Sequence, residues 1–207
     1  MSLKRAYWRA LKVFRPSEFR GSPPHGSTAV FPLRPMPHPT VDEENHPEAL
    51  ALAPWCRGKG IDVGCGHRKV LPECIGVDIL ARGENGQYGV VANKTSAADI
   101  RASGDDLRMF RDGELDYVVS RHNLEHYVDV VKTLLEWRRV LKPGGTLAIV
   151  VPDERAGDTI YLDPTHKHCF TPESLERLVT IIGGFDVIRS EIVIPKWSFL
   201  LVAIKVG

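Results

Sequence analysis

From His46 onward, short apolar runs alternate with longer segments in which apolar residues recur every three or four positions. The short runs have the length and composition of strands, and the longer segments have helical periodicity. Alternating strands and helices are typical of an α/β fold with a mostly parallel sheet and helices on both faces. The predicted strands span residues 60–63, 75–78, 97–100, 115–120, 146–151, 185–194 and 199–206.

The clearest helical pattern lies within residues 126–145. Four apolar residues recur there on one helical face: Val130, Leu134, Trp137 and Leu141. An amphipathic helix of this kind packs its apolar face on the sheet. Because proline and glycine disfavour helix continuation, we expect Pro143, Gly144 and Gly145 to end it.

A second helix is predicted after the fifth strand. Thr171 is a suitable N-cap, Pro172 suits the first helical position, and Gly183 follows the last apolar residues. The two remaining strands have no room for a helix between them, only a short turn at 195–198. The final strand must therefore run antiparallel, at or near the edge of the sheet.

The first 45 residues differ from the rest. Residues 1–15 carry five basic residues and no acid, with Leu3, Tyr7, Leu11 and Phe14 on one helical face. Such a helix either packs on its own domain or makes a weak contact with an anionic membrane surface or a partner. Six prolines in residues 21–41 indicate an extended segment. We therefore expect an extension over 1–45 and one domain over 46–207.

Composition limits the possible functions. A chain of 207 residues, 43% of them hydrophobic, can bury one sizeable core. Its 27 Lys and Arg residues nearly balance 26 Asp and Glu, so no strong field favours nucleic acid as a partner. The four cysteines form no Cys-x-x-Cys pair, and we find no signal peptide or membrane-spanning run. We expect a soluble cytoplasmic protein with free thiols; its oligomeric state cannot be read from the sequence.

The stretch "GIDVGCG" followed by "IGVDI" predicts a nucleoside site. Gly64 and Gly66 leave the backbone open after the first strand, and Asp78 ends the second strand. A carboxylate in that position can accept hydrogen bonds from two ribose hydroxyls. A nicotinamide dinucleotide is disfavoured because the turn lacks a third glycine, and Gly-Lys-Ser/Thr of a phosphate-binding loop is absent.

Four motifs in order carry a family resemblance: "GIDVGCG", "IGVDI", "LRMFRDGELDYVVSRHNLEH" and "RRVLKPGGTLAIVVPD". Residues 58–207 resemble the class I S-adenosylmethionine-dependent methyltransferases, in particular a small type with His-x-Leu-Glu-His after the fourth strand. The resemblance implies a Rossmann-like seven-stranded sheet with a reversed last strand. It also implies that the cofactor S-adenosylmethionine places its methionine end over the glycine turn and its ribose at Asp78.

The resemblance also implies an acid after the third strand that binds adenine, with a neighbouring backbone amide. Asp99 with Ile100 and Asp106 with Leu107 both fit, and the sequence leaves the two open. The full set of expected cofactor-binding residues is Asp62, Gly64, Cys65, Gly66, Asp78, Ile79, Asp99, Asp106, Leu107, Arg121 and His122.

Two histidine clusters lie in loops beside this site. The first contains His122, Glu125 and His126, which either brace the following helix or hold a metal; our expectation is no metal. The second contains His166 and His168, which either line the acceptor site or brace their loop. Histidine suits a general base because its pKa lies near neutrality. The candidate catalytic residues are thus His166, His168 and His122.

The acceptor class follows from weaker arguments. The Asn/Asp-Pro-Pro-aromatic motif of amino-methylating nucleic acid enzymes is missing where "SRHN" stands, and the Pro-Cys motif of cytosine-carbon enzymes is also missing. We therefore expect O-methylation of a small molecule or a sugar or glycan, by analogy with compact enzymes of similar layout. The alternative is a cofactor-binding module without catalysis, acting as a sensor or subunit.

Overall fold

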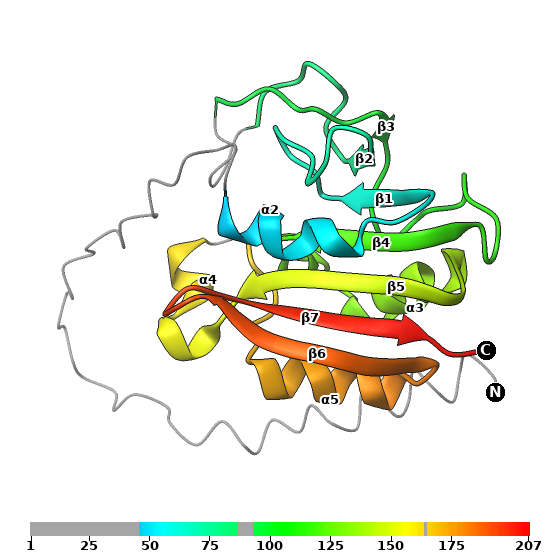
Figure 1. The fold of residues 1–207 in the computed structure, drawn as a ribbon. Helices are drawn as coiled ribbons and strands as arrows, with labels where there is room; N and C mark the ends of the chain where they lie inside the picture. Colours follow the sequence, from blue (N-terminus) through cyan, green and yellow to red (C-terminus); the bar gives the residue numbers. More distant parts are fainter. Residues whose placement is uncertain (1–45, 87–92, 164) are drawn as a thin grey trace, which may run out of the picture.

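The computed structural model describes residues 46–86, 93–163 and 165–207, which form one seven-stranded sheet with helices packed on it (Figure 1). The helix predicted over 1–15 and the proline-rich segment lie outside the described residues. The strand order is β3-β2-β1-β4-β5-β7-β6. The strands are β1 Gly60–Val63, β2 Ile75–Asp78, β3 Ile100–Arg101, β4 Leu115–Arg121, β5 Leu141–Pro152, β6 Phe185–Ile194 and β7 Ser198–Lys205.

The last strand is antiparallel, as its short connection predicts. Strand β7 lies between β5 and β6 and pairs antiparallel with both, while every pairing among β1 to β5 is parallel. The reversed strand is therefore one position inside the edge, and β6 forms the edge itself.

The third strand differs from the prediction over 97–100. Only Ile100 and Arg101 pair with β2 as a ladder. Residues 97–99 make single backbone hydrogen bonds instead of a ladder. One example is the bond that the Asp99 amide donates to the Gly76 carbonyl of β2 at 2.8 Å. The carboxyl end of this strand, at Arg101, thus lies one residue later than the predicted strand over 97–100 would place it.

The stop predicted at Pro143–Gly145 is also wrong. Helix α3 spans Val130–Val140, and Leu141 already has extended backbone angles and pairs with Leu115 of β4. Pro143, Gly144 and Gly145 belong to β5, where the pairing register shifts between Leu115 and Tyr117. Glycine is required here by geometry, since Gly144 has a φ of +78°.

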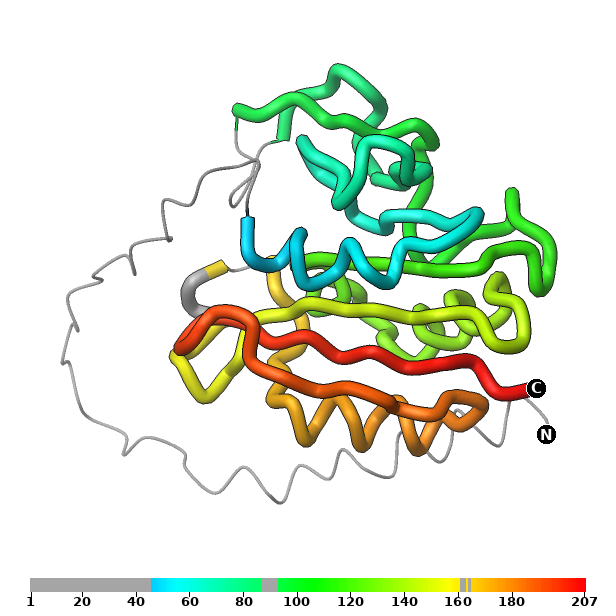
Figure 2. Tube along the Cα trace, viewed as in Figure 1, coloured from blue at the N-terminus to red at the C-terminus, as the bar shows by residue number. Residues whose placement is uncertain are grey.

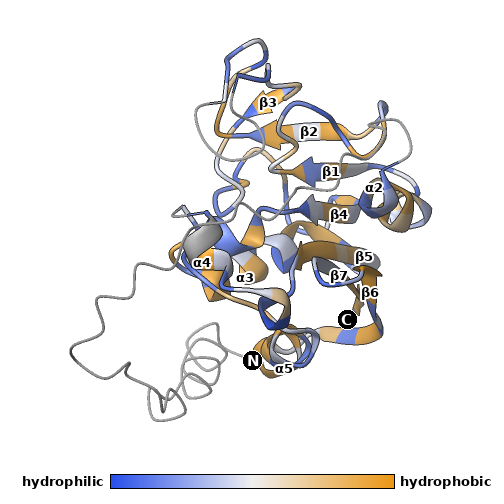
Figure 3. Ribbon diagram, turned by 90° about the vertical axis from the view of Figure 1, so that its left-hand side faces the viewer, coloured by the Kyte–Doolittle hydropathy of each residue, from blue (hydrophilic) through white to orange (hydrophobic). Residues whose placement is uncertain are grey.

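Helices cover both faces of the sheet. Helix α3 and helix α5 (Pro172–Ile182) pack on one face, where their apolar residues meet Val118, Leu147 and Ile149. Helix α2 (Pro47–Leu52) packs on the opposite face against β5, β6 and β7. Figure 3 shows the mainly hydrophobic colour of β5, the strand that both layers bury.

The second predicted helix is confirmed in detail. Thr171 caps α5 by accepting from the Ser174 amide, Pro172 is its first residue, and Gly183 is its C-cap. The remaining short elements are α4 (Thr159–Leu162) and 3-10 turns at Ala53–Trp55, Leu124–His126 and Glu154–Ala156. In the part of the chain that the structure describes, no helix is long and apolar enough to span a bilayer.

Candidate active site

The candidate site lies at the carboxyl edge of the sheet, where the strand order reverses at β1. From β1 the chain proceeds outward through β2 to β3, then returns to β4 on the other side of β1. Loops that follow β1, β2, β3, β4 and β5 therefore converge at this edge, the usual ligand position in such a sheet. Figure 2 shows that the start of the described chain and the turn between β6 and β7 lie at the same side.

The glycine turn after β1 is held by its own backbone. The amides of Gly64 and Cys65 both donate to the Val77 carbonyl, at 2.8 and 3.3 Å. Gly64 has a φ of +71°, and a Cβ there would lie 2.2 Å from Cγ of Asn123, which follows β4. Gly64 is thus required because Asn123 packs on it, and not only because a ligand must approach.

This packing gives a first prediction. Gly64→Ala should destabilise the fold by at least about 1–2 kcal/mol because of the left-handed backbone alone, and more because of the Asn123 contact. Adding Asn123→Gly should recover the contact cost but not the backbone cost. Urea unfolding of the two single variants and the double variant measures the coupling. An equal cost of Gly64→Ala with and without the Asn123 side chain would contradict this account.

Asp78 is placed as a ribose ligand requires. Its Oδ2 accepts from the Gly66 amide at 2.9 Å, and its Oδ1 accepts from the Leu80 amide at 3.0 Å. Each carboxylate oxygen keeps a second lone pair for a hydroxyl donor. The next residue, Ile79, has an isoleucine side chain that is 65% exposed. A fixed carboxylate beside an uncovered apolar side chain fits a ribose that carries a flat apolar base.

Asp62 is occupied by a contact within the protein, and its expected contact with the cofactor stays a prediction. Its side chain is buried within β1, and Oδ2 accepts from the Val70 amide at 2.6 Å. Burial raises the pKa of Asp62 to about 7, although the Val70 bond and the charge of Arg121 act against this rise. Asp62 therefore fixes the loop after β1 through its hydrogen bond with the Val70 amide.

The raised pKa of Asp62 gives a second prediction. An unfolded aspartate titrates near about pH 4. Between that pH and about 7 the folded protein keeps a proton that the unfolded chain has lost, so this residue makes stability fall as pH rises. Asp62→Asn keeps an acceptor oxygen for Val70 and removes the titration. The variant should gain stability relative to the wild type between pH 4.5 and 7.5, by up to about 4 kcal/mol. A difference in urea unfolding that stays constant with pH would contradict this.

Asp99 is excluded from the adenine position by its placement. It precedes β3, and its Oδ2 accepts from the Gly76 amide at 2.8 Å and from Lys69 Nζ at 3.0 Å, while Oδ1 pairs with Arg82. The Gly76 bond and Lys69 hold the pKa of this carboxyl below its usual range. Asp99 thus braces β2 beside its middle residues and does not reach the carboxyl edge.

Asp106 does follow β3, but its neighbour Leu107 is not available to adenine. The Leu107 amide donates to Glu136 Oε1 at 2.8 Å, and the side chain is fully buried. Asp106 pairs with Arg108 and stays partly exposed. A third acid, Asp105, also lies here; it accepts from Lys132 at 2.8 Å and from Ser103. Its position after β3 could have been read from "SGDDL".

Cys65 and Arg121 contribute in other ways than a side-chain contact with the cofactor. The Cys65 side chain is buried, so only its backbone faces the edge. Arg121 ends β4 and donates through Nη2 to the Arg68 carbonyl at 3.4 Å, which ties the loop after β1 to β4.

His122 lies beside two carboxylates that favour its protonated form. Its Nε2 lies 2.8 Å from Glu48 Oε1, and its Nδ1 lies 3.7 Å from Glu125 Oε1. Burial alone would lower the pKa of His122, but the charges of Glu48 and Glu125 raise it to about 10. Burial alone would raise the pKa of Glu48, yet His122 and Ser198 lower it to about 2. Glu48 and Glu125 thus stabilise the protonated form of His122, which acts against its expected role as a base.

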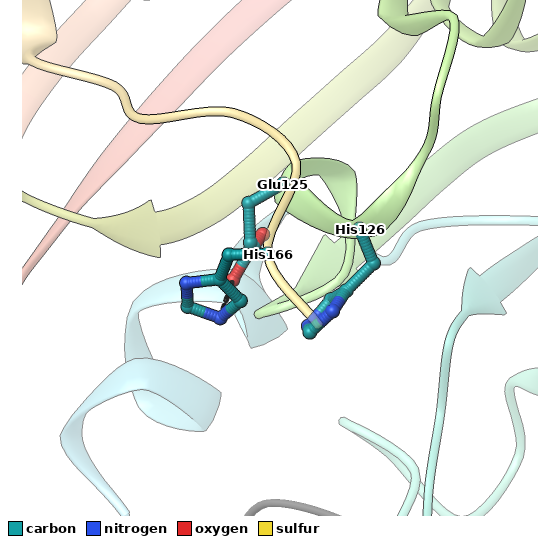
Figure 4. A group of neighbouring side chains, drawn as sticks. All are labelled: Glu125, His126 and His166. Carbon is teal, nitrogen blue, oxygen red and sulfur yellow. Dashed lines mark ion pairs between the residues drawn. The ribbon is translucent and has the colours of Figure 1, made fainter. Parts of the chain in front are cut away.

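Three other side chains meet beside it: Glu125, His126 and His166 (Figure 4). One ligand atom from each lies within 4.8 Å of the other two. The Glu125 side chain is 1% exposed, and among the described residues neither carboxylate oxygen has a hydrogen-bond partner. Burial lowers the pKa of His166, against the opposing charge of Glu125. This polar cluster, called the Glu-His-His cluster below, brings together the loops after β4 and β5.

A family model described as a methyltransferase domain matches residues 41–189. The chain belongs to this family. It is a class I methyltransferase, an enzyme whose cofactor is S-adenosylmethionine. No curated protein matches the sequence significantly.

Solved methyltransferase structures share the fold. A chain from the complex of the Haloferax volcanii Trm112 methyltransferase activator with a methyltransferase has a TM-score of 0.59 and 19% identity, over 80% of this chain and 92% of that one. An S-adenosylmethionine-dependent methyltransferase of Thermotoga maritima has a TM-score of 0.57 and 18% identity, and the match covers 76% of this chain and 87% of that one. The Burkholderia thailandensis 1,6-didemethyltoxoflavin-N1-methyltransferase has a TM-score of 0.55 and 18% identity, and the match covers 78% of this chain and 77% of that one. That structure contains bound 1,6-didemethyltoxoflavin and S-adenosylhomocysteine.

In this methyltransferase His168, another of the predicted catalytic histidines, lies outside the Glu-His-His cluster. Its Nε2 lies 3.3 Å from the Val128 carbonyl, and its ring stacks on Phe170. Its backbone amide donates to the Glu125 carbonyl at 3.1 Å, as does that of Lys167 at 2.8 Å. These bonds tie the loop after β5 to the turn after β4.

Several site residues escaped the sequence reading. Asn123 lies inside the motif after β4 and packs on Gly64; it also donates at 2.8 Å to the hydroxyl of Tyr127, the residue that directly follows the motif. Glu48 lies in α2, which precedes all four motifs in the sequence, and its carboxylate contacts His122 in the methyltransferase site. The same carboxylate accepts a hydrogen bond from the Ser198 hydroxyl at 2.6 Å. Position in the motif could have indicated Asn123, whereas no sequence signal indicated Glu48.

Proposed function

We propose that the enzyme methylates a hydroxyl oxygen of a small-molecule or sugar acceptor. The observation that carries this proposal is the Glu125 carboxylate, 1% exposed and without a hydrogen-bond partner among the described residues, beside His126 and His166. A hydroxyl must lose its proton to become a good nucleophile at neutral pH, whereas an amine that is already neutral needs no such group. A buried carboxylate with imidazole neighbours suits the first task.

The proposed cofactor site consists of Gly64, Gly66, Asp78 and Ile79, with Asp106 as the acid nearest the base. Bound there, S-adenosylmethionine supplies an electrophilic methyl group. The free lone pairs of Asp78 support ribose binding, and the exposed Ile79 side chain supports contact with the adenine ring. The left-handed Gly64 and its Asn123 contact fix the shape of the turn that the methionine end would meet.

On the acceptor side, residues of the chain itself would position the acceptor and exclude water from it. The Glu-His-His cluster would receive the hydroxyl, with His126 oriented by Thr165 and the loop after β5 held by His168. Alignment of the nucleophile and exclusion of water supply much of the rate in such transfers. We further propose that residues 1–45 form a separate extension and that the enzyme acts in the cytoplasm, where its four free cysteines would stay reduced.

Pools of hydroxylated small molecules and sugars, incubated with a ¹³C-methyl donor, test this function. We expect a product whose methyl carbon has the NMR shift of an O-methyl group. A methyl group on nitrogen or sulfur would contradict the proposal, and one structural neighbour does methylate a ring nitrogen. Binding without transfer to any acceptor class would favour the alternative of a sensor or subunit.

A further inference from the structure

The Glu-His-His cluster has the composition of a metal site. Glu125 and His126 come from the 3-10 turn Leu124–His126 after β4, and His166 comes from the loop after β5. Figure 4 shows the three side chains directed into one shared space. Two imidazoles and one carboxylate form a donor set typical of zinc and other divalent transition metals, and a poor one for magnesium.

The buried Glu125 carboxylate is the second observation that points to a cation. The His122 ring lies 2.8 Å from Glu48, whereas the nearest nitrogens of His122 and His166 lie 3.7 and 3.9 Å from Glu125 Oε1. Neither oxygen of Glu125 has a hydrogen-bond donor among the described residues. A buried carboxylate without a close partner is costly, and a bound cation would remove that cost.

The hydrogen bonds around His126 give it the tautomer of a ligand. The Thr165 hydroxyl donates its only proton to Asp163 Oδ1 at 2.6 Å. The same hydroxyl oxygen lies 3.0 Å from His126 Nδ1, so it must accept a proton from that nitrogen. His126 Nε2 therefore carries the free lone pair. Donation of the other ring N–H to a fixed oxygen acceptor is the usual second-shell support of a histidine metal ligand.

His166 supplies the third donor. Its Nε2 lies 3.9 Å from Glu125 Oε1 and 4.0 Å from Asp163 Oδ2, and its ring meets that of His126 edge-on at 4.7 Å between centroids. His122 is left out of the set because, among the described residues, the ligand atoms that all lie within 4.8 Å of one another come from Glu125, His126 and His166. The proposed ligand set thus differs from the sequence-based grouping of His122, Glu125 and His126 by having His166 in place of His122.

We propose that Glu125, His126 and His166 bind one divalent transition-metal ion, of the zinc or cobalt type. The present separations of up to 4.8 Å would close to about 3.4 Å around a tetrahedral ion, which side-chain rotation can supply. Three protein ligands leave a coordination position open. If the proposed O-methylation is correct, the acceptor oxygen occupies that position, and the ion lowers its pKa so that the proton leaves to water.

Titration of metal-free, untagged protein with Zn²⁺ and Co²⁺ tests the site. Calorimetry should give one ion per chain, and Co²⁺ should give visible absorption of a site with imidazole and carboxylate ligands. Glu125→Gln and His166→Gln should each weaken binding at least ~10-fold. His168→Gln is the matched control, since it removes a histidine two positions away that lies outside the cluster, and it should bind the ion as the wild type does.

S-adenosylmethionine affinity, measured on the same proteins without metal, reports whether each variant is folded and keeps the cofactor site. No ion bound by the wild type would overturn the proposal, as would equal binding by folded Glu125→Gln and His166→Gln proteins. If Glu125→Gln does not fold, His166→Gln alone decides. Methylation without any metal dependence would leave the proposed function standing and remove only the catalytic use of the ion.

Discussion

Replacing Asp78 with alanine should weaken S-adenosylmethionine binding at least ~10-fold in a protein that remains folded. Hydrogen bonds to a charged group contribute roughly 1.5–3 kcal/mol each, and the free lone pairs of Asp78 allow one bond to each ribose hydroxyl. The change also releases the Gly66 and Leu80 amides, which Asp78 holds at 2.9 and 3.0 Å. Calorimetry with the cofactor measures the loss directly.

Two further variants sharpen this experiment. Asp78→Asn keeps the shape and one acceptor oxygen, so it should lose less affinity than Asp78→Ala. Asp99→Asn changes the acid that braces Gly76 in the same strand, and it should leave affinity within about twofold because Asp99 does not reach the carboxyl edge. An unchanged affinity in folded Asp78→Ala would remove this residue from the site, and a large loss in Asp99→Asn would restore the rejected adenine contact.

The direction of the strands could be predicted because local signals decide it. Residues 60–63 and 75–78 each carry two β-branched apolar residues next to turn-forming residues, and the short turn before β7 leaves only an antiparallel return. Strand β3 was misplaced because two residues of ladder carry almost no periodicity. The segment Pro143–Gly145 was misread because a bulge at a strand start and a helix stop use the same residues.

The cofactor side of the site could be predicted where chemistry and backbone lie in one segment. Asp78 and Gly66 are twelve positions apart and joined by a hydrogen bond. The histidines were harder, because their roles depend on partners far along the chain. The sequence allows His122 to be a base, and only the fold places Glu48, 74 positions away, in contact with its ring. Likewise, only the fold brings His166 to Glu125.

His166→Gln should lower turnover by roughly 100-fold or more while cofactor affinity stays unchanged. The residue lies in the Glu-His-His cluster at the proposed acceptor position, where its ring faces Glu125 and Asp163. Turnover and the Michaelis constant of the acceptor should be measured from pH 6 to 9, with and without added Zn²⁺. His168→Gln, which removes a loop contact to Val128, should show a smaller loss that falls mainly on the Michaelis constant.

The pH and metal dependences of the His166→Gln loss separate its two chemical roles. If His166 takes the acceptor proton itself, the loss should shrink as alkali deprotonates the hydroxyl, and added metal should change nothing. If His166 binds an ion, the loss should shrink at each pH when excess Zn²⁺ restores occupancy of the weakened site. Full activity of His166→Gln and His168→Gln at every pH would exclude the loop after β5 from the chemistry, leaving Glu125 and His126 as the groups nearest the acceptor.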